Sequence, residues 1–185
     1  ATAYMGVSAY AAREEIDINL SGYVVIFLHD FYDSPHVWPD LLFDDFWSWA
    51  TFTIEFLINH NIKFVIKPHP NQRAESKLDC EKLEKMYPDV EIISDKVSNK
   101  NLVDSGIACG VTVYGTVAHE LAYLGVPSIC CAQHPHHTFS FCRTAANVSE
   151  YEDLLKTYLQ SPLPKKELSK QSLQFYKSEI TCGDY

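Results

Sequence analysis

The chain has 185 residues, of which 46% are hydrophobic, so it can bury one sizeable core and is rather short for two. Its 24 Asp and Glu against 15 Lys and Arg give a formal net charge of -9, which argues against nucleic acid as a partner. The charge does not argue against a pocket for one nucleotide, because such a pocket needs only a few cations and amides. No apolar run approaches the roughly 18 residues of a membrane span, so no transmembrane segment is expected.

Short β-rich runs alternate with helical segments along the chain, a pattern typical of a parallel sheet with helices on both faces. In chain order we expect a strand at 23–28, a helix at 41–59, a strand at 63–67, a helix at 75–86, strands at 90–93 and 107–113, a helix at 116–124, a strand at 128–131 and a helix at 151–159. The predicted fold class is therefore α/β, a Rossmann-like doubly wound parallel sheet. Its ligands should bind along the edge where the strand C-terminal ends gather.

The two ends of the chain fit this scheme less well than its middle. Residues 1–21 precede the first strand and are interpreted as an approach segment or the remnant of a partner domain. Residues 22–160 form the Rossmann-like domain, and the polar residues 161–185 a C-terminal tail or return helix. The N-terminus carries neither an initiating Met nor the regions of a signal peptide, so we expect a fragment of a longer protein, with the mature end of a processed chain as the alternative.

The six cysteines are scattered through a chain that has ample residues for a core, and no Cys-x-x-Cys pair occurs. The adjacent Cys130 and Cys131 fall in the apolar run 126–132, where small buried thiols are common. We therefore expect reduced, structural thiols rather than a disulfide framework.

A histidine between two prolines follows the second expected strand, in Lys67-Pro68-His69-Pro70. Proline restricts both its own φ and the residue before it, so the His69 ring is presented from a stiff loop at a strand C-terminus. Such a ring can donate to a phosphate. The alternative is a proline-rich strand exit with an exposed histidine of no special role.

The stretch from Gly110 to Glu120 predicts a strand, a glycine turn at Tyr114-Gly115, and a helix that opens with Thr116-Val117. Free amides of the first helical turn, beside the Thr116 hydroxyl, make an anion site. Glu120 lies one turn further on the same face, where a carboxylate can reach ribose hydroxyls. The alternative is a plain N-cap at Thr116 with a solvated Glu120.

Two further segments place histidines and carboxylates at the expected ligand edge. In 29–36, Asp30 or Asp33 is a candidate general base, with simple loop capping as the alternative. A metal held by His29, Asp30, Asp33 and His36 is less favoured, because their spacing matches no ligand signature.

The second segment, residues 133–139, follows the last expected strand. We expect it to be a mobile loop that closes over the ligand and lets His134 contact sugar or phosphate. Zinc is less favoured there, since no thiol or carboxylate lies at ligand spacing.

These motifs occur in the order Lys67-Pro-His-Pro, Gly115-Thr116-x-x-x-Glu120, Gly125-Val126-Pro127. Over residues 23–155 the chain thereby resembles the C-terminal domain of GT-B glycosyltransferases of bacterial capsule and surface-polysaccharide biosynthesis. The His-Pro pair is similar to that of sialyltransferases, Kdo transferases and CDP-glycerol glycerophosphotransferases. The resemblance implies one half of a GT-B architecture, a cytidine donor, and donor phosphate contacts from His69 and Thr116. The acidic base followed by glycine that sialyltransferases carry in their N-terminal domain has no counterpart here.

The expected function is transfer of a sugar from a CMP- or CDP-linked donor to a growing surface polysaccharide. His69, Asp30 and Asp33 are the candidate catalytic residues, and Lys67, Pro70, Tyr114, Gly115, Thr116, Val117, Glu120 and His134 the candidate substrate-binding residues. We expect no metal and no cofactor besides the donor. The partners are a glycan or lipid-linked glycan acceptor and a missing N-terminal domain, without which this chain should be inactive. A cytoplasmic location, including the inner membrane face through the parent protein, follows from this function. A UDP-sugar 2-epimerase and a non-catalytic nucleotide- or glycan-binding module are the alternatives.

Overall fold

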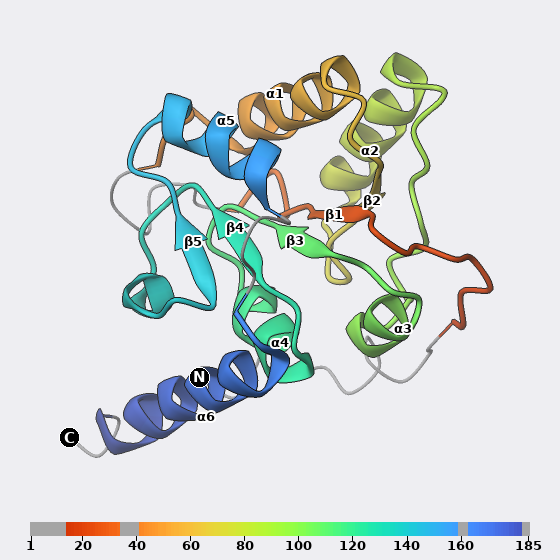
Figure 1. The fold of residues 1–185 in the computed structure, drawn as a ribbon. Coiled ribbons are helices and arrows are strands. Elements are labelled where there is room, and N and C mark those ends of the chain that lie inside the picture. The colour runs from red at the N-terminus through yellow and green to blue at the C-terminus, as the bar shows by residue number, and fades with distance from the viewer. Residues whose placement is uncertain (1–13, 34–40, 159–162, 183–185) are drawn as a thin grey trace.

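The computed structural model describes residues 14–33, 41–158 and 163–182, and side chains up to residue 178. Its centre is a five-stranded parallel sheet in the order β2-β1-β3-β4-β5 (Figure 1). The strands are β1 (Val24–Phe27), β2 (Phe64–Lys67), β3 (Cys109–Val111), β4 (Ser128–Cys130) and β5 (Cys142–Thr144). In the register, Val25 of β1 pairs with Val65 of β2 on one side and with Gly110 of β3 on the other.

The strand expected at 90–93 is wrong as a full strand. Turns on both sides, one from Tyr87 to Val90 and one from Ser94 to Val97, leave only a single parallel bridge between Ile92 and Ile66. The Ile92 bridge lies beside β2 and takes the place of the third strand of the Rossmann pattern. In that pattern the strand order reverses between the first and the fourth strand. In this chain the reversal lies between β1 and β3, and ligands of open α/β sheets bind at that place.

Helices cover both faces of the sheet (Figure 1). On one face lie α1 (Phe46–Asn59), α2 (Ala74–Met86) and α5 (Val148–Thr157). On the other lie α3 (Asn99–Asp104), α4 (Val117–Leu124) and α6 (Lys165–Cys182). The α/β, Rossmann-like doubly wound parallel sheet is thus confirmed.

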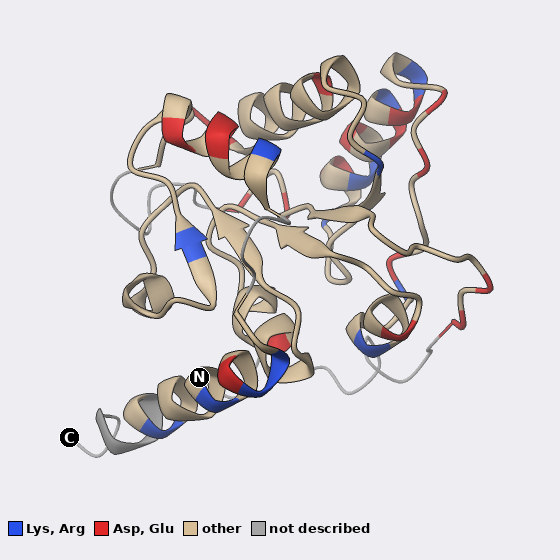
Figure 2. Ribbon diagram, viewed as in Figure 1, with Lys and Arg blue, Asp and Glu red and all other residues tan. Residues whose placement is uncertain are grey.

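The strands are apolar on both sides, because both faces are buried. Val24 and Ile26 of β1 pack under α1, while Val25 and Phe27 pack toward α3 and α4. Charge is confined to the helices, the loops and two strand positions, Lys67 of β2 and Arg143 of β5 (Figure 2).

Several boundaries differ from the expected ones for local reasons. Helix α1 begins at Phe46 rather than at residue 41, because the Asp45 side chain accepts the Ser48 amide and caps it. Strand β5 was not expected at all. The expected mobile loop after β4 contains a short 3-10 helix, η2 (Pro135–Thr138).

Both ends that fit the sequence pattern poorly pack on the domain where they are described. Leu20 is fully buried, and its amide donates to the Ser105 carbonyl. Helix α6 lies against α4, where Ser172 Oγ donates to the His119 carbonyl at 2.7 Å. Residues 1–13 lie outside the described part. Among the described helices, none is both long and apolar enough to cross a membrane.

Candidate functional site

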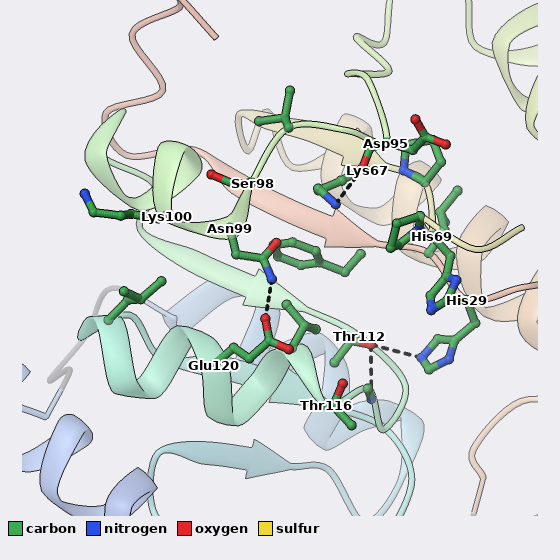
Figure 3. Close-up of a pocket in the computed structure, with 18 of the residues that line it drawn as sticks. His29, Lys67, His69, Asp95, Ser98, Asn99, Lys100, Thr112, Thr116 and Glu120 are labelled. Carbon is green, nitrogen blue, oxygen red and sulfur yellow. Dashed lines mark hydrogen bonds between the residues drawn. The ribbon is translucent and has the colours of Figure 1, made fainter. Parts of the chain in front are cut away.

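A pocket of about 830 Å³ lies at the C-terminal ends of β1, β2 and β3, where the strand order reverses. Its wall comes from the strand exits at 27–29, 67–70 and 112–117, from the loop 95–100 that leads into α3, and from α4 and α6. His29, His69 and Thr112 lie toward one end of the pocket, and Glu120 with Asn99 toward the other (Figure 3). The fold therefore gathers loops from distant parts of the sequence at one site.

Lys67, the last residue of β2, places a cation at this pocket. The residue is only 5% exposed, and its ammonium donates to the Asp95 carbonyl at 3.3 Å. Burial lowers the pKa of Lys67, although the carboxylates of Asp95 and Glu120 act against that shift. Two other lysines line the pocket, and each forms an ion pair: Lys96 with Glu14, and Lys100 with Asp104. Among the described residues, no ion pair includes Lys67. Its charge is the one most available to a bound anion.

His69 is held in a defined tautomer by its own loop. Its Nδ1 accepts the Asn71 amide at 3.2 Å, so in the neutral ring the proton lies on Nε2. Burial lowers the pKa of His69, and the Lys67 charge acts in the same direction, against the opposing effect of Asp30 and Asp33. A neutral His69 can therefore donate through Nε2 to a phosphate oxygen at neutral pH.

A second histidine, His29, forms the floor beside it. Its Nε2 accepts the Val113 amide at 3.3 Å and lies 3.0 Å from the Thr112 hydroxyl, while its ring stacks on Phe46. Burial, with a contribution from His69, lowers the pKa of His29 to about 3. The Thr112 oxygen also accepts the Gly115 amide at 3.3 Å. Burial thus keeps His29 neutral, and this chain of hydrogen bonds ties the exit of β1 to the turn after β3.

Glycine is required in that turn by close packing. A Cβ at Gly115 would lie 2.8 Å from Thr112 Oγ1. At the far end of α4, Gly125 caps the helix with φ of 89°, as the sequence pattern indicates.

The N-terminus of α4 opens on the pocket through Thr116 and Val117. Thr116 occupies the N-cap position, but its side chain makes no capping hydrogen bond, so the capping alternative does not account for the hydroxyl. The first amides of a helix lack intrahelical partners and carry a partial positive charge. One turn on, Glu120 accepts from the Asn99 amide group at 2.7 Å. Hydroxyl, amides and carboxylate thus line one side of the pocket.

The two candidate bases lie in different surroundings. Asp30 does not belong to the pocket wall: it accepts from the Ser76 hydroxyl and from the amides of Tyr32 and Arg73, just before α2. Burial alone would raise the pKa of Asp30, but these hydrogen bonds lower it overall. Asp33 is exposed, and its charge acts on both His69 and Tyr114.

The remaining predicted residues, Pro70, Tyr114 and His134, all line the pocket. Burial and the charge of Asp33 raise the pKa of Tyr114 to about 12, which keeps the phenol a hydrogen-bond donor. His134 is the N-cap of η2, and its ring centre lies 4.0 Å from that of His136. His36, a member of the less favoured metal set with His29, lies outside the described residues.

Sequence reasoning missed the wall formed by Asp95, Ser98 and Asn99. A local signal for this wall was present, because Ser98 caps α3 by accepting the Asn101 amide. It also missed Leu173 and Tyr176 of α6, which reach the pocket only because α6 packs on α4. No local pattern indicates that packing.

Neither the comparison with protein-family models nor that with curated proteins finds a match. Among solved structures, the chain is similar to a UDP-GlcNAc 2-epimerase from Methanocaldococcus jannaschii in complex with UDP-GlcNAc and UDP, with a TM-score of 0.54 and 14% identity over 86% of this chain and 46% of that one. It also aligns with the wall teichoic acid polymerase TagF, with a TM-score of 0.45 and 14% identity over 87% of this chain and 39% of that one. The chain thus spans less than half the length of these proteins. At this identity the first likeness shows the fold.

Proposed function

We propose that this chain is the donor-binding domain of a glycosyltransferase that transfers a sugar from a nucleotide-activated donor, CMP- or CDP-linked, to a surface glycan. The observation that carries the proposal is the convergence of Lys67, His69, Thr116 and the α4 N-terminus on one pocket at the reversal of strand order. These groups suit a phosphate, since they combine a buried ammonium, a neutral ring N–H, a hydroxyl and backbone amides.

In this proposal the donor phosphates lie between the exit of β2 and the start of α4. His69 Nε2–H, the Thr116 hydroxyl and the amides of Thr116 and Val117 stabilise the negative charge that grows on the leaving phosphate. Glu120, toward the other end of the pocket, accepts from ribose hydroxyls. His134, on the connection between β4 and β5, contacts the sugar or phosphate.

The acceptor base comes from Asp33 or Asp30, or from a second domain. Asp33 is the better placed of the two, because it is exposed and its charge acts on pocket residues, whereas Asp30 is engaged by three donors at the start of α2. A general base works best with a pKa near the working pH, and the lowered pKa of Asp30 makes it a weaker candidate.

A UDP-sugar 2-epimerase is the second candidate. It is supported by the similarity in fold to an enzyme of that kind over 86% of this chain. The two functions differ in what they consume: an epimerase converts a UDP-sugar with no acceptor, while a transferase releases the nucleotide only as the sugar moves to an acceptor.

Calorimetric titration of the chain with CMP, CDP, UMP, UDP and GDP tests the proposal. CMP or CDP should bind most tightly, His69→Ala should weaken binding, and His60→Ala, which changes an exposed histidine outside the pocket, should not. A preference for UDP would contradict the cytidine donor and favour the epimerase. Absence of binding by all five nucleotides would contradict both functions.

A further inference from the structure

Two cysteines and a histidine meet on the side of the sheet that α4 and α6 cover, away from the exits of β1 and β2. Cys130 ends β4, Cys142 begins β5, and His136 belongs to η2 between them. The two Sγ atoms lie 3.0 Å apart, and His136 Nε2 lies 3.9 Å from Cys130 Sγ. Within the described residues this is the one group of three such side chains whose ligand atoms all lie within 4.8 Å of one another.

The cluster is buried and leaves an imidazole poorly satisfied. Cys130 and His136 are 0% exposed and Cys142 is 3% exposed. His136 Nδ1 has no hydrogen-bond partner among the described residues, and the contact of Nε2 is a long one to a thiol. Burial of a ring nitrogen whose contact with a polar group is this long costs free energy, so apolar packing alone does not explain His136 Nε2 at this position.

We propose that Cys130, His136 and Cys142 bind a zinc-type divalent cation. Zn²⁺ takes sulfur ligands at about 2.3 Å and imidazole nitrogen at about 2.0 Å in a tetrahedron, which sets the two sulfurs about 3.8 Å apart and sulfur and nitrogen about 3.5 Å apart. To reach these values, the sulfurs, now 3.0 Å apart, must separate by about 0.8 Å, and Cys130 Sγ and His136 Nε2, now 3.9 Å apart, must approach by about 0.4 Å. Cys142 Sγ and His136, whose ligand atoms lie within 4.8 Å, must approach by at most about 1.3 Å.

The charge balance also favours this ion. On binding, each thiol releases its proton to solvent and forms a metal–thiolate bond, while neutral His136 contributes the Nε2 lone pair. Two thiolates and a dication sum to zero, which is the charge that a buried site tolerates best. His119 packs beside the cluster, with its ring centre 5.9 Å from that of His136, but its ring nitrogens do not belong to the group whose ligand atoms all lie within 4.8 Å of one another.

The site also reaches the pocket. His134 packs against the His136 ring at 4.0 Å, and its Nδ1 accepts the His136 amide at 3.4 Å. A cation on His136 therefore anchors η2 to both strands and holds His134 at the pocket wall. This role does not depend on which nucleotide the pocket binds.

Cobalt titration of the reduced, chelator-treated chain tests the proposal. One equivalent of Co²⁺ should produce a thiolate-to-cobalt charge-transfer band in the near ultraviolet, and Zn²⁺ should abolish it by displacement. Cys142→Ala should lose the band. Cys131→Ala is the matched control and should keep it, because Cys131 is as buried as Cys130 but packs on the opposite face of the sheet.

A second measurement does not require a variant to fold. In mild urea, where local opening exposes buried thiols, Zn²⁺ should slow the alkylation of Cys130 and Cys142 by iodoacetamide, as followed over time by mass spectrometry, while the half-buried Cys80 should react at the same rate with and without the metal. The proposal is overturned if excess Co²⁺ gives no thiolate band, if Cys142→Ala gives the same band, or if Zn²⁺ protects neither thiol. A Cys130–Cys142 disulfide, with no bound metal, in protein isolated without reductant would also overturn it.

Discussion

Replacement of Lys67 by Met removes the buried cation from the pocket while it preserves most of the side chain's bulk. A hydrogen bond to a charged group contributes about 1.5–3 kcal/mol, which corresponds to a change in Kd of roughly 10- to 150-fold. We expect the lower part of this range, about 10- to 30-fold, because the Asp95 carbonyl and the Glu120 charge already balance part of the ammonium. Calorimetric titration with CDP at fixed ionic strength measures the change.

Lys63→Met is the matched control. Lys63 precedes β2, at the opposite end of the strand from Lys67, and its ammonium lies 5.8 Å from the centre of the Tyr23 ring. This variant should bind CDP as the wild type does. The Lys67 variant should unfold thermally near the wild-type temperature, since a methionine is readily buried. If folded Lys67→Met binds CDP and UDP with wild-type Kd, the phosphate site does not include this lysine and the orientation of the nucleotide is wrong.

In the transferase proposed above, His69→Ala removes a donor to the leaving phosphate, so steady-state kinetics should show kcat lowered about a hundredfold. Glu120→Ala should mainly raise KM, and wild-type kinetics in both variants would refute the site. The pKa of His29 is lowered to about 3, so the unfolded chain binds the extra proton below about pH 6.5, and stability present at pH 7 is lost as the pH falls. The free energy of unfolding in urea should fall between pH 7 and pH 5, and the fall should be about 1–2 kcal/mol larger in the wild type than in His29→Gln. An equal fall in both proteins would contradict the neutral ring. Tyr151→Phe should cost about 1–3 kcal/mol in urea unfolding, because it leaves the buried Trp49 indole N–H without its acceptor, whereas no loss would mean that water replaces the hydroxyl.

Local signals in the sequence determined the elements themselves. The apolar runs of β1 and β2 predict buried parallel strands, because a strand that is covered on both faces is apolar along its whole length. The rigid loop around His69 and the glycine turn before Thr116 are equally local, since proline and glycine act on their own backbone. One local signal was overlooked at the start of α5, where the Asn147 side chain accepts the Glu150 amide and the Glu150 carboxylate accepts the Ala146 amide. These caps place the start of α5 three residues before the expected one.

The tertiary structure decided which of these elements meet. Strand order brings the exits of β1, β2 and β3 to one pocket, and no periodicity along the chain specifies that order. The same holds for Asp30, whose carboxylate accepts from Ser76 and Arg73 more than 40 residues away. Strand β5 has only three residues and exists because β4 offers its edge, and that pairing is what brings Cys142 beside Cys130. Propensity and capping act within one or two turns of chain, while side chains far apart in sequence become neighbours only when burial of both sheet faces selects the packing.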